Sequence, residues 1–535
     1  MNKHRALEAY REARAHFDWT LPKTFNFARD VVDRFARVPE RPALLYCDTH
    51  GRTRRFGFGE MSDGIHRFAS LLDRLGLVPG ERLLVLLPPL PEWQLSVIGA
   101  MAAGVLAVPT SIAILSREEI LHRAAHSGAV AVVTTRSQVP LINSLAGDLP
   151  ALRHRLLVRE DGDEEAVPEA WIDFEQALRS GDPEWPVRET QLSDPALVLY
   201  TSGTTGRPKA VLHDHGYPYA AARQGVHWHG LRAADRFWPT TGWAKAAFVP
   251  WSCGAEIVVT RERASPGRQL ELLAELAPQV FCAPPTQYRL MLKEDLSGFR
   301  VPQLRECVAA GEPLNPEVVT AWHNATGLRI RDGYGQSEAG LLVANQVGLP
   351  QKAGSMGLPL PGFEVEVINE REEILAAGAE GDLAVRLPAP GVFAEYWRDA
   401  EATRRSRRGA WYVTGDRARR DADGYLWFIG RADDVIISAN QRIGPFEVES
   451  RLLEHPDVVE AAAVAEPDAD LGHVVKAWVV LRSGIHASDE LVDALRQLFA
   501  ETERDRVPAR FAFVESLPKT ATGKIRRKAL REVGA

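Results

Sequence analysis

Short apolar runs alternate with helix-like stretches along much of the chain, from Ala43 to about Ala310. The apolar runs have the length and composition of buried strands. Alternation of strands and helices is typical of stacked parallel β/α layers. We therefore predict an α/β fold, with a large N-terminal α/β domain made of several subdomains, as expected for a chain of 535 residues.

The segment Leu95–Leu115 contains no charged residue and is long enough to span a membrane. Gly99 and Gly104 interrupt it, however, and it follows an apolar run at Leu83–Leu87 and a proline-rich breaker. Central elements of α/β proteins also appear as continuous apolar runs, because they are buried on both faces. We therefore predict a strand, a helix that stops at Gly104 and a buried strand at Val105–Val108, and no membrane span.

The pattern changes near residue 430, where a strand at Tyr425–Ile429 ends in a compact polar segment. We interpret this segment as a hinge between an N-terminal domain, residues 1–432, and a small mobile C-terminal α+β domain, residues 433–535. In the C-terminal domain Ser488 is expected to cap a helix with acidic residues in its first turn. The strands expected there are Val458–Val464, Ala477–Leu481 and Phe511–Val514.

Charge and composition narrow the classes of function. The 64 Lys and Arg residues against 71 Asp and Glu give a net charge of −7, which argues against a nucleic-acid scaffold. The four cysteines lack the paired spacing of a zinc site or disulfide framework, so we expect a cytoplasmic protein. At the N-terminus Leu7, Tyr10 and Phe17 lie at near-helical spacing among charged residues, which predicts a docked amphipathic helix rather than a secretory signal.

A loop rich in hydroxyl groups follows the apolar strand Ala196–Tyr200. Glycines let backbone N–H groups converge on an anion, hydroxyls add donors and a lysine adds positive charge, so the loop is suited to a polyphosphate. It is not a Walker A loop, because its lysine lies between Pro208 and Ala210. The alternative is a polar turn. The predicted phosphate-binding residues are Thr201, Ser202, Gly203, Thr204, Thr205, Gly206 and Lys209.

This loop resembles the signature of the adenylate-forming (ANL) superfamily, which includes acyl-CoA synthetases, aryl-CoA ligases, luciferases and peptide-synthetase adenylation domains. The resemblance extends over nearly the whole chain. The further motifs that resemble those of the family are Ala310–Leu314, Asp332–Glu338, Tyr412–Asp416, Gly430–Asp434 and Leu517–Lys524. The stretches that are most similar to medium-chain acyl-CoA synthetases are Cys282–Thr286, Gly311–Asn315 and Arg442–Glu449.

The resemblance implies an ATP site. Activating a carboxylate with ATP requires positive groups that meet the charge developing on the α-phosphate. Lys524 is implied as that catalytic group, Glu338 as a catalytic residue and Mg²⁺ ligand, and Asp416 as an acceptor for the ribose hydroxyls. The other implied ATP contacts are Gly311, Glu312, Pro313, Asp332, Gly333, Tyr334, Gly335, Gln336, Ser337, Arg431 and Arg442.

Each of these roles has a simpler alternative. Lys524 could be a solvated surface lysine, Glu338 an exposed glutamate and Asp416 a turn cap. Arg431 and Arg442 could instead form structural ion pairs. The six motifs occur in the order of the family, which favours the ATP site.

The same resemblance implies a hinge and a coenzyme A site. A change of a few backbone dihedrals at Asp433 would swing the C-terminal domain between an adenylating and a thioester-forming pose. The coenzyme A contacts are implied at Ala439, Asn440 and Gln441, where relatives commonly have Ser-Gly-aromatic. Leu471 stands where the family often has an arginine for a coenzyme A phosphate. Losing that exposed contact would weaken binding by roughly 1 kcal/mol.

A pocket for the acid is implied by the residues Trp243, Lys245, Phe248, Ala310 and Gly340. Trp243 and Phe248 would form apolar walls, and the small residues leave room for a substrate of some bulk. Lys245 either points outward or closes the floor of the pocket. The stretch has no acidic partner for an ammonium group. An aliphatic, alicyclic or simple aromatic acid is therefore expected rather than an amino acid.

Two His-x-His pairs, His213/His215 and His227/His229, raise the question of a metal site. Alternate histidines without a neighbouring Cys or carboxylate cluster rarely complete a set of metal ligands. We therefore interpret His213–Tyr219 as a polar loop above the nucleotide.

Together these features predict a two-step acid–thiol ligase. A carboxylic acid and ATP give an acyl adenylate and pyrophosphate, and coenzyme A then displaces AMP; the cofactors are ATP, Mg²⁺ and coenzyme A. The alternatives are an acyl-AMP ligase that loads a carrier protein and a catalytically silent nucleotide- or acyl-binding regulator. No nucleic-acid partner is expected, and a homodimer is left open.

Overall fold

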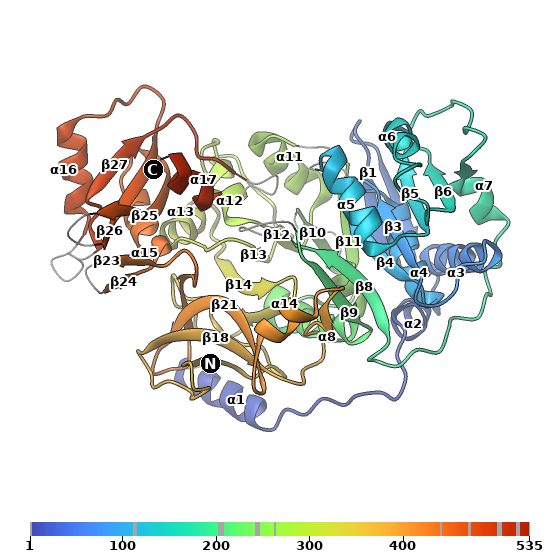
Figure 1. Ribbon diagram of the computed structural model, residues 1–535, viewed down its shortest axis with the longest axis horizontal. Coiled ribbons are helices and arrows are strands. Elements are labelled where there is room, and N and C mark those ends of the chain that lie inside the picture. Colours follow the sequence, from blue (N-terminus) through green and yellow to red (C-terminus); the bar gives the residue numbers. More distant parts are fainter. Residues whose placement is uncertain are drawn as a thin grey trace.

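The computed structural model describes residues 3–110, 115–201, 208–240, 247–261, 264–438, 441–468, 472–499, 506–519 and 525–533. Two large mixed sheets with helices packed on them form the body of the molecule, and an antiparallel sheet and a smaller C-terminal unit follow (Figure 1). The predicted α/β class, with a large N-terminal part and a small C-terminal part, is confirmed.

The first sheet, called sheet A, has the strand order β16-β15-β14-β13-β12-β10-β11-β1-β2. Its central strands β1, β10, β11, β12, β13 and β14 run parallel, whereas β2, β15 and β16 pair antiparallel at the two edges. The strands are β1 Pro42–Cys47, β2 Thr53–Gly57, β10 Arg236–Pro239, β11 Glu256–Thr260, β12 Val280–Ala283, β13 Glu306–Ala310, β14 Ile330–Gln336, β15 Gly340–Ala344 and β16 Leu358–Pro359.

The second sheet, called sheet B, has the order β19-β9-β8-β4-β3-β5-β6-β7. The short strand β19 comes from a distant part of the sequence and pairs antiparallel with β9. The strands are β3 Arg82–Leu86, β4 Leu106–Thr110, β5 Ala131–Thr135, β6 His154–Val158, β7 Ile172–Asp173, β8 Pro195–Tyr200, β9 Ala210–Asp214 and β19 Glu395–Tyr396.

Helices α3 and α4 are central to the main hydrophobic core, and their residues pack with side chains from both sheets. Within the described residues the α-helices are α1 Lys3–Ala15, α2 Asp33–Ala36, α3 Phe58–Arg74, α4 Pro91–Ala102, α5 Arg117–Ser127, α6 Val139–Ser144, α7 Phe174–Arg179, α8 Gly216–Gln224, α10 Phe248–Ser252, α11 Pro266–Leu276, α12 Pro285–Met291, α13 Pro316–Thr326, α14 Ala400–Arg405, α15 Pro445–Leu453, α16 Asp489–Gln497 and α17 Arg527–Val533.

The uncharged segment near residue 100 folds as the strand, helix and strand that were predicted. Helix α4 is buried on almost every side, and Gly104 adopts a φ of +74° where the chain turns into β4. Residues 111–114 lie outside the described part. Across the helices of the described residues, none combines the length and apolar character needed to cross a membrane.

A third, antiparallel sheet, called sheet C, was not predicted. Its strands are β17 Val365–Ile368, β18 Glu380–Arg386, β20 Arg407–Arg408, β21 Trp411–Arg420 and β22 Leu426–Arg431. Helix α1 packs beside this sheet, as Figure 1 shows. The Tyr10 hydroxyl donates to the Pro359 carbonyl at 2.8 Å, and Trp19 Nε1 donates to the Gly362 carbonyl at 2.8 Å. The predicted docked N-terminal helix is therefore confirmed.

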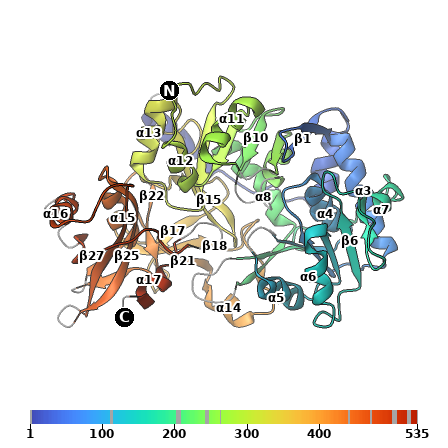
Figure 2. The same cartoon turned by 90° about the horizontal axis from the view of Figure 1, so that it is seen from above.

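The C-terminal unit has its own hydrophobic clusters, formed by residues from Ile436 onward. The three predicted strands and the helix capped by Ser488 are present, and the unit lies at one end of the molecule (Figure 2). Its strands are β23 Ile436–Ser438, β24 Gln441–Ile443, β25 Val458–Asp468, β26 Gly472–Leu481 and β27 Arg510–Phe513. A domain boundary at residue 432 stays a prediction.

Candidate functional site

Asp416 on β21 faces the end of β14, so the candidate site joins sheets A and C. The carboxylate is 4% exposed and accepts hydrogen bonds from the Tyr334 hydroxyl at 2.5 Å and from Gln336 Nε2 at 2.6 Å. Arg431 Nη1 lies 3.3 Å from its other oxygen, and the Tyr412 hydroxyl donates to Gln336 Oε1 at 2.8 Å. The structure thus brings together residues from three of the predicted motifs and fixes the orientation of the Asp416 carboxylate.

A tight return between β14 and β15 presents Ser337 and Glu338. A Cβ on Gly335 would lie 2.0 Å from the Gly340 carbonyl oxygen, so no side chain fits at residue 335. The Ser337 carbonyl accepts a hydrogen bond from His213 Nε2 at 2.6 Å. The return is therefore tied to the β8–β9 hairpin of sheet B.

Glu338 is held by a segment that lies far from it in sequence. Its Oε1 accepts a hydrogen bond from the Tyr396 hydroxyl at 2.9 Å, and its main-chain carbonyl accepts one from the Phe393 amide at 2.7 Å. The Lys209 ammonium lies 4.8 Å from the centroid of the Tyr396 ring. Glu338 and Lys209, predicted for Mg²⁺ and phosphate, thus approach the same tyrosine.

The predicted phosphate loop closes between Thr201 and Lys209, whose main-chain groups are joined by a 2.9 Å hydrogen bond from the Thr201 amide. Lys209 itself is exposed. The residues of this loop that lie outside the described part are Ser202, Gly203, Thr204, Thr205 and Gly206, so their contacts are not assigned. The described ends of the loop carry the Thr201 hydroxyl and the Lys209 ammonium, and phosphate binding by the loop stays a prediction.

The predicted adenine segment follows β13. Gly311 is exposed and has a φ of +96°, a backbone conformation that glycine adopts without strain. Pro313 is also exposed. The Glu312 carboxylate accepts a hydrogen bond from the Thr286 hydroxyl at 2.6 Å, at the start of α12. Glu312 therefore holds a helix terminus, a structural role that was not anticipated.

Asp332 lies on β14, two residues before Tyr334, and is 8% exposed. Burial disfavours the charged carboxylate and raises the pKa of Asp332 to about 8. Its neighbour Gly333 lies close to Trp228, because a Cβ there would meet the indole ring at 2.6 Å. Asp332 is therefore a candidate hydrogen-bond donor at neutral pH.

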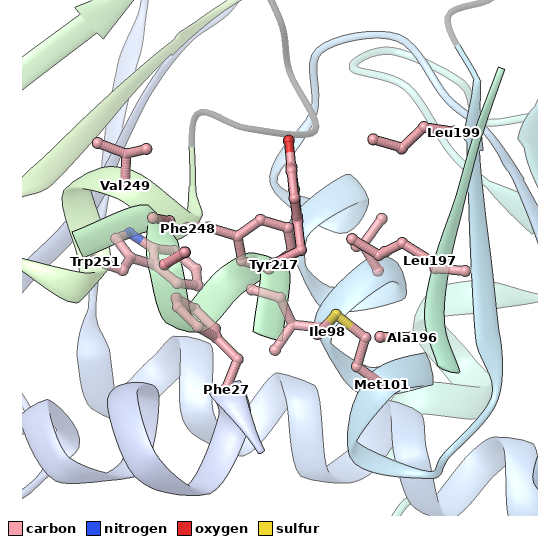
Figure 3. Packing of buried hydrophobic residues seen from close by; sticks show 14 of the residues in the cluster. Phe27, Ile98, Met101, Ala196, Leu197, Leu199, Tyr217, Phe248, Val249 and Trp251 are labelled. Carbon is pink, nitrogen blue, oxygen red and sulfur yellow. The ribbon is translucent and has the colours of Figure 1, made fainter. Parts of the chain in front are cut away.

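Two predicted acid-pocket residues pack against the same side chain, Tyr217 of α8. Phe248 lies 6.4 Å from Tyr217 between ring centroids, and a Cβ on Gly340 would lie 3.6 Å from the Tyr217 ring. Figure 3 shows Tyr217 between Phe248 and the apolar side chains Leu197 and Leu199. Within the described part of the chain the buried Tyr217 hydroxyl makes no hydrogen bond, and burial raises the pKa of its phenol.

The structure describes only some of the residues predicted for the acid pocket and for the coenzyme A site. Ala310 is half-buried at the end of β13, and Gln441 is exposed on β24. Arg442 pairs through its main chain with Ile437, and its side chain is not described. The predicted residues that lie outside the described part are Trp243, Lys245, Ala439, Asn440, Leu471 and the catalytic candidate Lys524.

The candidate hinge forms a turn. The Asp434 amide donates to the Arg431 carbonyl at 3.0 Å, which places Ala432 and the exposed Asp433 at the two central positions. Arg531 of α17 donates to the Asp434 carboxylate at 3.0 Å. The predicted hinge residue therefore lies at a turn whose following residue is fixed to the C-terminal helix.

The interpretation of His213–Tyr219 as a polar loop is wrong. His213 lies on β9, which ends at Asp214, and α8 begins at Gly216, so that the Tyr217 ring lies 4.1 Å from the His213 ring. Burial lowers the pKa of His215 to about 4 and that of His229 to about 3. These histidines belong to the packed interior beside the site.

The donor groups suit a magnesium ion bound together with phosphates. Among the described residues, His, Cys, Asp and Glu side chains do not gather in groups of three or more that would hold a metal by themselves. Mg²⁺ usually binds through one or two carboxylates, waters and substrate phosphates. Glu338 fits that pattern, and Mg²⁺ binding by Glu338 stays a prediction.

Comparison with known proteins assigns the chain to a family. Residues 31–397 match the family model described as AMP-binding enzyme, and residues 447–524 match AMP-binding enzyme C-terminal domain. The chain belongs to the AMP-binding enzyme family. The resemblance to the adenylate-forming superfamily is thereby confirmed.

Relatives of this AMP-binding enzyme match it over nearly the full length. The acyl-coenzyme A synthetase ACSM4, mitochondrial, of Rattus norvegicus is 39% identical over 541 residues, which covers 96% of this chain and 91% of the relative. The acyl-coenzyme A synthetase ACSM5, mitochondrial, of Homo sapiens is 37% identical over 533 residues, with coverage of 96% and 91%. Both names include "mitochondrial", so they give no support to a cytoplasmic location, which stays a prediction.

Solved structures show the same fold. The anthranilate CoA ligase AuaEII in complex with anthranoyl-AMP has a TM-score of 0.87 at 30% identity and covers 96% of this chain and 98% of its own. The benzoate CoA ligase from Burkholderia xenovorans LB400 has a TM-score of 0.81 at 28% identity, with coverage of 95% and 100%.

Sequence reasoning missed the neutral side chains that hold the charged ones. Tyr396 and Thr286 each donate a hydrogen bond to a carboxylate predicted for the ATP site. Tyr396 lies on a two-residue strand, for which the apolar pattern gives no signal. Thr286 was noted only as part of a motif, and its contact with Glu312 depends on the packing of α12 beside β13.

Proposed function

We propose that this AMP-binding enzyme is an ATP-dependent acyl-CoA synthetase. A carboxylic acid attacks the α-phosphorus of ATP, giving the acyl adenylate and releasing pyrophosphate. The thiol of coenzyme A then attacks the acyl carbon and AMP leaves. The acyl-coenzyme A synthetases and CoA ligases that match the chain over nearly its whole length support this reaction.

The observation that carries the proposal is the convergence of the predicted ATP residues at the junction of sheets A, B and C. Asp416, held by Tyr334 and Gln336, presents an acceptor-only group for the ribose hydroxyls. Lys209 and Glu338 both contact Tyr396. Lys209 supplies a cation for phosphate, and Glu338 supplies a carboxylate for Mg²⁺. Mg²⁺ would neutralise charge on the phosphates when bound.

Lys524 is proposed to stabilise the charge that develops on the α-phosphate during adenylation. Its segment is anchored at both described ends, because Lys519 and Ile525 form a β-bridge and the Arg526 amide donates to the Pro518 carbonyl at 2.8 Å.

The acid is proposed to be aliphatic, alicyclic or a simple aromatic. Phe248 is predicted for the acid pocket and packs against the Tyr217 ring, and two CoA ligases with matching folds are an anthranilate CoA ligase and a benzoate CoA ligase. Gly340 lacks a side chain where Tyr217 and Gln224 approach it. The homodimer and the cytoplasmic location are not supported by these observations and stay predictions.

The proposed reaction is tested by acid-dependent AMP release over a panel of aliphatic, alicyclic and aromatic acids, with and without coenzyme A, and by mass detection of the thioester. A coenzyme A-dependent thioester for one class of acid is the expected result. Pyrophosphate exchange without thioester would favour a carrier protein as the acceptor, and competition between coenzyme A and a phosphopantetheinylated carrier would decide it. Tight ATP binding with no AMP would favour a silent regulator.

A further inference from the structure

Strand β19 brings a distant segment to the phosphate side of the site. Tyr396 pairs with Val211 on β9, two residues after Lys209 in the hairpin. In Figure 1 the orange helix α14, which follows β19, lies beside the green strands β8 and β9 although about two hundred residues separate them in sequence. The position of Tyr396 is therefore fixed by sheet pairing, not by a loop.

Tyr396 contacts both charged groups of the proposed phosphate site. Its hydroxyl donates to Glu338 Oε1 at 2.9 Å, and its ring face meets the Lys209 ammonium at 4.8 Å. The side chain is 6% exposed and packs against the Phe393 ring at 4.8 Å between centroids. A buried ring with these contacts restricts the positions of both charges.

The hydroxyl of Tyr396 is matched to a carboxylate. A phenol hydroxyl donates one hydrogen bond, and Tyr396 donates it to Glu338 Oε1. A hydrogen bond to a charged acceptor is among the stronger ones in proteins.

The two charged groups contact different parts of the same side chain, the hydroxyl and the ring face. Among the ion pairs formed by the described residues, Lys209 and Glu338 are not partners of each other. An ion pair between them would neutralise the groups intended for phosphate and metal. A cation over a tyrosine face keeps its full charge.

We propose that Tyr396 is a positioning residue. It orients the Glu338 carboxylate toward Mg²⁺ and holds the Lys209 ammonium away from that carboxylate, so that both charges are available to the nucleotide. The inference rests on the proposed function and goes beyond it, because Tyr396 is not among the residues predicted to contact ATP, the acid or coenzyme A. It assigns the tyrosine to the ATP half-reaction alone.

The test uses two substitutions in the full-length enzyme. Tyr396→Phe keeps the ring and removes the hydrogen bond to Glu338, whereas Tyr396→Leu removes the ring face as well. Tyr396→Phe is expected to raise the Mg²⁺ concentration for half-maximal pyrophosphate exchange about tenfold. Tyr396→Leu is expected to have the same effect and also to raise the KM for ATP at saturating Mg²⁺, because the ring face that meets Lys209 is lost. Thioester formation from preformed acyl adenylate should stay within about twofold of wild type.

The control is Tyr10→Phe, which removes another buried phenol hydroxyl, the donor to the Pro359 carbonyl, far from the nucleotide site. This variant should keep the wild-type Mg²⁺ requirement. A second readout that does not depend on turnover is the rise in melting temperature on adding ATP with and without Mg²⁺. The extra rise due to Mg²⁺ should shrink in Tyr396→Phe and persist in Tyr10→Phe.

An unchanged Mg²⁺ requirement in Tyr396→Phe would overturn the inference. So would an equal loss of both half-reactions, because a purely structural role would lower them together. If wild type shows no acid-dependent AMP release, the proposed function fails, while the Mg²⁺-dependent melting shift still tests the contact between Tyr396 and Glu338.

Discussion

Asp332 is a carboxyl group that β14 keeps away from water. Its pKa of about 8 in the folded protein lies far above the unfolded value of about 3.9. Between these values the folded state holds a proton that the unfolded chain has released. The stability that Asp332 contributes is therefore fully present below the unfolded pKa and is lost as the pH rises through about 8.

Replacing Asp332 by Asn removes this titration and keeps the shape of the protonated acid. The free energy of unfolding of wild type relative to Asp332→Asn is expected to fall between about pH 5 and about pH 9 and to level off above that. Urea unfolding of both proteins across this range measures it. A difference that does not change with pH would show that Asp332 is ionised in the folded state.

Replacement of Lys524 should lower the adenylation rate more than replacement of any other predicted site residue. If it acts as a single oxyanion donor, Lys524→Ala should lower the adenylation rate roughly 10²–10³-fold. Pyrophosphate exchange measures this rate. Lys528→Ala is the matched control, because Lys528 lies on α17 and, within the described part of the chain, forms an ion pair only with Glu532, at 3.9 Å. Activity of Lys524→Ala within about tenfold of wild type would remove the assignment.

At the scale of single residues, the sequence predicted the charged groups of the candidate site better than the neutral groups that bind them. Glu338 and Asp416 were predicted because each lies in a motif, and the structure brings their motifs together. Tyr396 and the structural role of Glu312 were not predicted. Hydrogen-bond partners from distant segments depend on strand pairing and helix packing, which spacing along the chain does not reveal.

At the scale of elements, buried strands and helices were predictable and the antiparallel sheet was not. The strand β4 is buried at every position and was recognised as an apolar run. The strand β21, Trp411–Arg420, alternates between buried and half-exposed positions and ends in several arginines, so its apolar pattern is weak. Its side chains gain their partners only when sheet C packs on the rest of the molecule.

Strand lengths were also underestimated where polar residues continue a pairing. The strand β25 was expected to end at Val464 but extends to Asp468, because β26 pairs with it along its whole length. Glu466 accepts hydrogen bonds there from Lys476 at 2.6 Å and from Arg510. Cross-strand ion pairs allow charged residues to stay in a ladder that a hydrophobic pattern would end.

At the scale of the whole molecule, the turn at Asp433 is the candidate pivot between the two parts of the chain. Arg527 of α17 forms a bidentate pair with Glu449, and Arg531 holds Asp434, so the chain becomes rigid immediately after the turn. A change of pose would then be confined to the dihedrals of Ala432 and Asp433.

Asp433→Pro restricts this pivot, because proline fixes φ and also constrains Ala432 before it. Pyrophosphate exchange is expected to stay largely intact, while thioester formation slows. Rapid-quench measurement of the two half-reactions separates them. Asp433→Ala, which removes the carboxylate without restricting the backbone, should leave both rates near wild type, and an equal loss of both halves in the proline variant would contradict the pivot.

The first residues of the chain cross from sheet C to the body of the molecule. Arg14 pairs with Glu366 of β17 in sheet C at 3.5 Å, and Trp19 binds the Gly362 backbone shortly before that strand, whereas the Phe25 amide donates to the Thr190 carbonyl at 2.8 Å beside sheet B. Because this segment contacts two regions, the unfolding of either region breaks contacts that the segment makes with the other. The N-terminal segment therefore couples the unfolding of the antiparallel sheet to that of the α/β body, and heat should melt them as one cooperative unit.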